Sequence, residues 1–84
     1  MNQAQIDKIV RTAQKNEITE HIIYQKLSQV TKDSHNREIL LRISDDEKRH
    51  YNQWKDYTRR TEKPNWIKVW TYYLVSRAFG LTLA

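Results

Sequence analysis

Two glutamates and a Glu-x-x-His motif interrupt the apolar patterns of this chain. Apolar side chains recur at steps of three and four in two long stretches, as they do on one face of a helix. Glu17 and Glu20 occupy that face in the first stretch, and Glu47 and His50 occupy it in the second. Buried carboxylate and imidazole groups are costly unless they are paired, neutralised or bound to a metal. Since residues at i and i+3 lie on one side of a helix, Glu47 and His50 can grip one divalent cation.

Two long helices are expected to carry these side chains. The first covers residues 3–30 and the second residues 36–60, and a single glycine and a single proline in the chain leave little material for β-turns. The intervening TKDSH, residues 31–35, offers Asp33 and Ser34 as helix N-caps. A link this short favours an antiparallel helical hairpin, and the predicted fold class is all-α.

The hairpin brings the ionisable groups to one level. With the turn centred near Lys32, Glu17 and Glu47 are equally distant from it along their helices, and His50 lies one turn further on the same face. These three residues, with Glu20 as an accessory ligand, make an incomplete set. Two hairpins related by a two-fold axis would supply two Glu17 residues and two Glu47-x-x-His50 pairs. That is the ligand set of ferritin-like di-iron and di-manganese bundles.

We therefore expect the hairpin to be half of a four-helix bundle that a second copy completes. The homodimer would hold two metal ions. A chain of 84 residues buries a modest fraction of its surface and usually needs a metal, a disulfide or a partner. Because the sequence has no cysteine, disulfides and thiolate metal sites are excluded.

The chain changes character towards its C-terminus. Residues 1–62 form the expected hairpin domain, and residues 63–84 form a basic, aromatic tail in which Lys63-Pro64 closes the second helix. The stretch WIKVWTYYLVSRAFGLTLA is apolar nearly all round but contains Lys68 and Arg77. A bilayer-spanning helix takes about 20 predominantly apolar residues, and central charges are costly. The tail is therefore expected to be an apolar helix that lies at a membrane surface, packs on the bundle, or begins a longer segment.

Other polar residues near the expected site allow two interpretations. Tyr24 is either a core residue with its hydroxyl at the rim or a hydrogen-bond donor to a ligand carboxylate. Asp46 lies four residues before His50 but beside the apolar face, so a surface role competes with orienting the imidazole. His21 and His35 are expected to be exposed.

Taken together, these motifs resemble a known family. NEITEHIIY at residues 16–24 and DDEKRHY at residues 45–51 look like the first half of a rubrerythrin-type ferritin-like domain. The nearest likeness is to rubrerythrin-like domains fused in front of vacuolar-iron-transporter-type membrane proteins, whose basic, aromatic continuation also ends near a GLT triplet. The two-helix encapsulated ferritins, in which dimerisation creates the di-iron centre, are similar in pattern.

The resemblance implies iron handling, with ferroxidase or rubrerythrin-like oxidoreductase activity. The chain departs from the family in two ways. It has no second helix pair with another Glu-x-x-His, so it is either a fragment of a transporter fusion or a half-size form that dimerises. It also lacks the cysteines of the rubredoxin-like iron site, which puts peroxidase-type electron delivery in doubt.

The expected cofactor is iron, because carboxylates with one imidazole per ion suit iron or manganese, and zinc is a further option. With iron, the expected function is Fe(II) binding and oxidation at the site between two hairpins. Two alternatives stay open. One is a non-catalytic module that senses iron or delivers it to a membrane transporter, and the other is a structural helical dimer.

The charge pattern bears on partners and location. The net charge is +5, and nearly all of the excess lies beside the aromatic tail. This favours an anionic membrane surface over nucleic acid, because the basic residues form no continuous stripe on either long helix. The N-terminus lacks the features of a signal peptide, which favours a cytoplasmic location with membrane association through residues 63–84.

Overall fold

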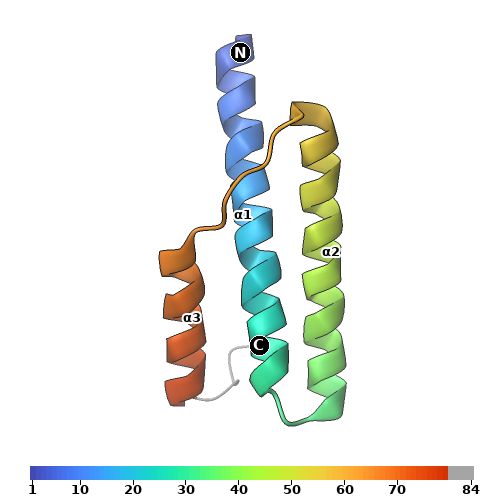
Figure 1. The fold of residues 1–84 in the computed structure, drawn as a ribbon, viewed down its shortest axis with the longest axis vertical. Coiled ribbons are helices and arrows are strands. Elements are labelled where there is room, and N and C mark those ends of the chain that lie inside the picture. Colours follow the sequence, from blue (N-terminus) through green and yellow to red (C-terminus); the bar gives the residue numbers. More distant parts are fainter. Residues whose placement is uncertain (80–84) are drawn as a thin grey trace.

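The protein is a helical hairpin with a third helix packed beside it. The computed structural model describes residues 1–79, which form α1 (Gln3–Val30), α2 (Ser34–Thr58) and α3 (Trp66–Phe79). In Figure 1, α1 lies in the middle, α2 runs antiparallel to it on one side, and α3 lies on the other side. The predicted all-α class and the antiparallel hairpin are confirmed. Residues 80–84, the end of the predicted tail, lie outside the described residues.

Side-chain caps determine where the two long helices begin. The side chain of Asn2 accepts a hydrogen bond from the Gln5 amide at 2.8 Å, and the Gln5 side chain accepts one from the Asn2 amide at 2.9 Å. This reciprocal pair is a capping box. At the start of α2, Asp33 accepts a hydrogen bond from the Asn36 amide at 2.9 Å. Asp33 is thus the N-cap, and α2 begins two residues before the predicted residue 36.

A small apolar core joins all three helices near the turn of the hairpin. Ile23 and Leu27 of α1, Leu40 of α2 and Val69 of α3 are buried together, and Val69 is 0% exposed. Ile22 and Tyr24 pack against this cluster. Further from the turn, the buried polar side chains of Gln14, Thr19 and Ser44 lie among the buried apolar side chains of Val10, Ile18 and Tyr51. The contiguous apolar cluster is therefore confined to the part of the hairpin beside the turn.

The second helix ends earlier than predicted. It stops at Thr58, before the expected residue 60 and well before the expected stop at Lys63-Pro64. Arg59 takes a left-handed conformation with φ of 58°, and its amide donates to the Lys55 carbonyl at 2.8 Å. A left-handed residue just after a helix is a common C-terminal cap, usually glycine, because a side chain adds steric strain.

The buried amide of Gln14 explains why α2 can end at a non-glycine residue. Its nitrogen donates to the Arg60 carbonyl at 2.5 Å, and its oxygen accepts from the Thr58 hydroxyl at 3.0 Å. Gln14 is 0% exposed and lies on α1, so the contact holds the end of α2 against the neighbouring helix. Two hydrogen bonds to a buried amide satisfy polar groups that would otherwise be costly to bury.

The segment after α2 crosses α1 and starts α3 on the opposite side (Figure 1). The Tyr51 hydroxyl accepts a hydrogen bond from the Glu62 amide at 3.1 Å, and the Glu62 carboxylate pairs with Arg11 at 2.7 Å. Further along, the Thr19 hydroxyl accepts from the Asn65 amide at 2.9 Å. Asn65 then caps α3 by accepting from the Lys68 amide at 3.1 Å. These contacts place α3 against α1.

The third helix packs on the hairpin through one face. Val69 is buried in the shared core, whereas Ile67 is 83% exposed and Leu74 is 62% exposed. Within residues 1–79, no helix combines the length and the apolar composition that crossing a bilayer requires. The inner face of α3 thus packs on the hairpin, as one of the interpretations of the tail predicted. Its outer face is not covered by the described residues.

Replacing Gln14 should destabilise the fold more than an exposed glutamine would. In Gln14→Ala the Arg60 carbonyl and the Thr58 hydroxyl lose a buried partner, so we expect a loss of about 1–3 kcal/mol of unfolding free energy. Urea denaturation followed by circular dichroism measures it. Gln25→Ala, at an exposed position of the same helix, is the matched control. Equal stability of the two variants would show that the Gln14 contacts do not stabilise the end of α2.

Candidate metal centre

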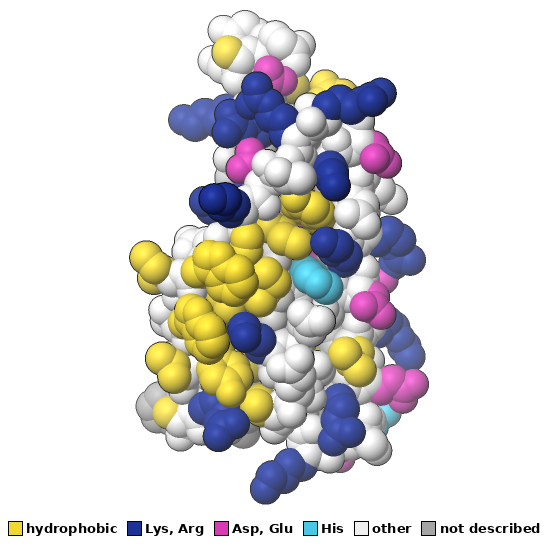
Figure 2. All heavy atoms as spheres, in the orientation of Figure 1, with side chains coloured by type: hydrophobic (Ala, Val, Ile, Leu, Met, Phe, Trp, Pro, Cys, Tyr) yellow, Lys and Arg dark blue, Asp and Glu magenta, His cyan; other side chains and the backbone are white. Residues whose placement is uncertain are grey.

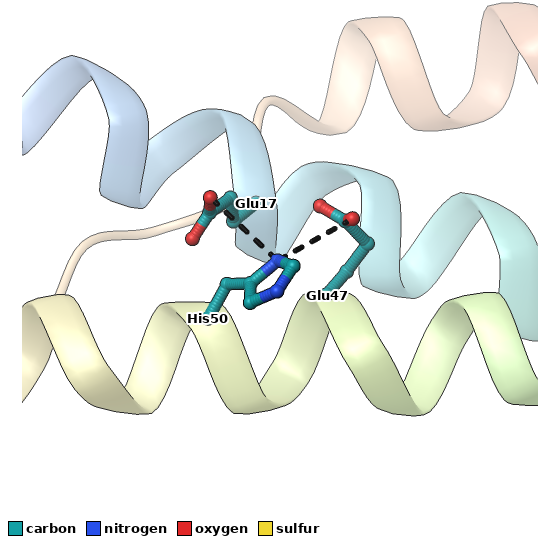
Figure 3. Close-up of side chains that lie close together, drawn as sticks. All are labelled: Glu17, Glu47 and His50. Atoms are coloured by element: carbon teal, nitrogen blue, oxygen red, sulfur yellow. Dashed lines mark ion pairs between the residues drawn. The ribbon is translucent and has the colours of Figure 1, made fainter.

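Three side chains from two helices converge at the predicted level of the hairpin. Glu17 comes from α1, and Glu47 and His50 come from successive turns of α2. One ligand atom of each lies within 4.8 Å of the other two. The His50 Nδ1 atom is 4.0 Å from Glu17 Oε1 and 3.7 Å from Glu47 Oε1. Figure 3 shows the imidazole between the two carboxylates, with all three side chains pointing into the space between the helices.

A polar contact next to the site holds the two helices in register. The His21 Nδ1 atom lies 2.8 Å from the Ser44 carbonyl oxygen and 2.9 Å from the Ser44 hydroxyl. That hydroxyl also donates to the His21 carbonyl at 2.9 Å. Ser44 lies one turn before Glu47, and His21 lies one turn after Glu17. Because this contact is adjacent to the carboxylates, a shift of one helix along the other would break the contact and would also separate Glu17 from Glu47 and His50.

His21 is therefore not exposed as predicted. It is half-buried, whereas His35 at the turn is exposed as expected. A signal was present in the sequence, since a histidine and a small hydroxyl residue occur at the same level of the two helices. The contact between His21 and Ser44 follows from the same equal distance to the turn that predicts the meeting of Glu17 and Glu47.

The carboxylates are shielded from water more than the imidazole is. The side chains of Glu17 and Glu47 are 21% and 18% exposed, and that of His50 is 47% exposed. The second carboxylate oxygen of Glu17, Oε2, is buried and has no hydrogen-bond partner among the described residues. Such an atom is rare in folded proteins and calls for an explanation, of which an ion is one.

Burial and like charges raise the pKa of Glu47 from 4.5 to about 7. Burial of the carboxyl group is the largest cause, because it penalises the charged form. A hydrogen bond with Glu20, the charge of Glu20 and the charge of Glu17 add to the effect, and His50 opposes it. Near neutral pH the Glu47 carboxyl group is thus partly protonated and partly ionised. A cation that binds this group must displace its proton.

The remaining predicted residues surround this cluster without joining it. Glu20 lies beside Glu47 but outside the three-residue group. Tyr24 packs against the apolar core, and no hydrogen bond joins its hydroxyl to a carboxylate within residues 1–79. Asp46 forms an ion pair with Arg49 and is 44% exposed. These contacts fit the core interpretation of Tyr24 and the surface interpretation of Asp46.

An apolar groove runs along the hairpin up to the carboxylates. It has a volume of about 610 Å³ and is walled by α1, α2 and α3. Glu20 lies at one end of it, one turn from Glu17, and its apolar lining includes Ile39, Ile43, Tyr72 and Val75. All three helices thus contribute to the walls of the groove, and Glu20 is the carboxylate among its described lining residues.

The donor set fits a cation such as iron or manganese. Two carboxylates and one imidazole supply the oxygen and nitrogen ligands that these metals take, and the buried Oε2 of Glu17 lacks a positive partner. Three side chains leave coordination positions free for water, substrate or further protein ligands. The zinc option also stays open, since zinc accepts the same donors.

No protein-family model, curated protein or solved structure matches the chain. The positions of the ligand atoms, their burial and their charges are the observations on which a functional proposal can be built.

The metal-free protein should lose stability as the pH rises from about 4.5 to about 7. Over this range the folded state holds a proton on Glu47 that the unfolded chain has released, so unfolding becomes easier with increasing pH. A shift of this kind corresponds to a loss on the order of 3 kcal/mol. Glu47→Gln should remove this contribution. Urea titrations across the pH range measure it, with Glu38→Gln at an exposed position as control. An unchanged pH slope in Glu47→Gln would contradict the assignment.

Proposed function

We propose that this protein binds iron at Glu17, Glu47 and His50 and functions in Fe(II) binding and oxidation. The observation that carries the proposal is the meeting of three ligand atoms from two helices within 4.8 Å, at a site where a buried carboxylate oxygen lacks a partner. Two shielded carboxylates leave an uncompensated negative charge between the helices. A divalent cation compensates that charge with the donors already present.

The proposed unit is a dimer of hairpins, because one hairpin supplies half of a di-metal ligand set. The apolar groove supports this part of the proposal. Ile39, Tyr72 and Val75 line it and are 39%, 52% and 40% exposed. The groove opens on the same side of the hairpin as Glu20, so a second copy seated there would approach the carboxylates. Two copies would then hold two ions, with Glu20 of each as an accessory ligand.

Iron held by these side chains would supply electron transfer to dioxygen or peroxide. The residues of this chain have simpler tasks. Glu17 and Glu47 provide negative charge at a shielded position, and His50 provides a neutral nitrogen ligand. Glu47 must lose its proton before it can bind a cation, so its raised pKa makes the proposed affinity depend on pH. The contact between His21 and Ser44 holds the helices that carry all three side chains.

Two alternatives use the same residues. A non-catalytic module would bind iron and present it to a membrane transporter, with slow oxidation. A purely structural dimer is favoured by one observation, the raised pKa of Glu47, because a protonated carboxyl can be buried without a metal. Metal content separates the structural dimer from the other two functions, and oxygen consumption with Fe(II) separates oxidation from delivery.

Metal binding should stabilise the protein and depend on the three ligands. A cation that binds only the folded state adds about 2.7 kcal/mol at a hundredfold excess over Kd. We expect Fe(II) under anaerobic conditions, or Mn(II), to raise the melting temperature and chelation to reverse the effect. The response should be lost in Glu17→Ala, Glu47→Ala and His50→Ala.

The controls for this test are Glu38→Ala and His35→Ala, which remove the same chemical groups from exposed positions. Both should keep the full response. A melting temperature that rises equally in Glu47→Ala and in Glu38→Ala would show that the ligands lie elsewhere. The affinity for Mn(II) should also increase from pH 5.5 to pH 7.5, since the proton on Glu47 competes with the metal.

The dimer should depend on the groove. Ile39→Glu places a charge on its wall, and we expect it to shift the mass measured by light scattering from dimer to monomer and to weaken metal binding. Ile9→Glu is the matched control, because Ile9 is 54% exposed on α1 and does not line the groove. A monomer that binds metal with full affinity would contradict the proposed two-copy site.

A further inference from the structure

The third helix exposes an apolar surface on the side that does not meet the hairpin. Its outer face carries large side chains that are between 47% and 83% exposed, and we call them the outer patch: Trp66, Ile67, Trp70 and Leu74. A helix that is apolar on all sides is usually buried in a core or in a membrane. Only one face of α3 meets the hairpin, so its outer face requires another apolar environment.

The outer patch is separate from the groove of the proposed dimer. None of its four residues lines that groove. In Figure 1, α3 lies at the edge of the molecule, beside α1 and on the side opposite to α2. Figure 2 shows hydrophobic side chains gathered over α3 on this face, with Lys and Arg side chains beside them. A flat surface can therefore reach α3 without displacing either helix of the hairpin.

The charged side chains of residues 63–79 are all positive. No aspartate or glutamate occurs between Glu62 and Phe79, a segment that contains Lys63, Lys68 and Arg77. In addition, the ammonium of Lys26 on α1 lies 4.5 Å from the centre of the Trp70 ring. Further cations lie beside aromatic rings of the same helix, with Lys68 5.9 Å from Tyr72 and Arg77 6.0 Å from Tyr73.

This combination is typical of surfaces that meet a bilayer. Tryptophan and tyrosine prefer the boundary between water and hydrocarbon, where one end of the ring is apolar and the other is wet. Lysine and arginine extend their apolar stems along such a surface and keep their charges at the level of the headgroups. A protein partner of matching chemistry would need acidic residues around an apolar centre. The groove of a second copy does not offer this, because Glu20 is the only acidic residue among its described lining residues.

We infer that the outer patch docks on anionic lipid headgroups, with α3 lying in the plane of the membrane surface. Ile67 and Leu74 would enter the outermost acyl region, Trp66 and Trp70 would lie at the boundary, and Lys26, Lys63 and Arg77 would contact phosphates. A helix of 14 residues is about 21 Å long, which suits lying on a bilayer.

Co-sedimentation of the full chain with vesicles tests this inference. Vesicles of phosphatidylcholine with phosphatidylserine should bind the protein, and binding should weaken with salt because the phosphate contacts are electrostatic. Ile67→Glu combined with Leu74→Glu should lower the partition coefficient at least about tenfold, since each large apolar side chain contributes roughly that much. Ile9→Glu, exposed on α1, is the control and should bind like the unchanged protein.

A charge test separates lipid attraction from general hydrophobic adsorption. Lys63→Glu with Arg77→Glu should abolish the preference for phosphatidylserine, whereas Lys8→Glu should keep it. Helicity and melting temperature identify variants that fail to fold. Equal sedimentation of the Ile67→Glu, Leu74→Glu variant and the Ile9→Glu variant would overturn the inference. Equal binding to neutral and anionic vesicles would also overturn it. If the protein does not bind vesicles and the Ile67→Glu change lowers its mass in solution, the outer patch is a contact with a second copy instead.

Discussion

Negative charge shielded between two helices is the constraint on which this structure depends. Glu17 and Glu47 come from different helices and are both largely removed from water, with Glu20 close to Glu47. Carboxylates in such a position repel one another and are penalised by burial, so at least one must bind a proton or a cation. The protein allows both solutions, because Glu47 can hold a proton near neutral pH and His50 adds a nitrogen ligand at the same place.

The rest of the fold holds Glu17, Glu47 and His50 in position with a small apolar core and a few hydrogen bonds. The core of Ile23, Leu27, Leu40 and Val69 lies beside the turn, on one side of the carboxylates. On the other side, Gln14 joins the end of α2 to α1 through hydrogen bonds. The helices are thus held at both ends of the site by different interactions. The contact between His21 and Ser44 then fixes their register next to it.

The path of the chain after α2 gives the molecule two distinct apolar surfaces. Because residues 59–65 cross α1, α3 forms the third wall of the groove instead of extending α2. One side of α3 therefore faces the groove, where a second copy is proposed to bind. The outer patch faces the opposite direction, where a lipid surface is proposed. The two partners would contact different faces, so dimerisation and membrane docking are compatible.

Much of this was available from the sequence. The steps of three and four, the short link and the cap at Asp33 predicted two antiparallel helices, because these are local properties of the chain. The equal distances of Glu17 and Glu47 from the turn predicted that they would meet, since helix rise is constant. The end of α2 was predicted too late because it depends on Gln14, which lies 46 positions before the Arg60 carbonyl that it binds. The half-burial of His21 and the crossing of α1 by residues 59–65 were likewise decided by the tertiary structure, because each depends on contacts between side chains and backbone far apart in the sequence.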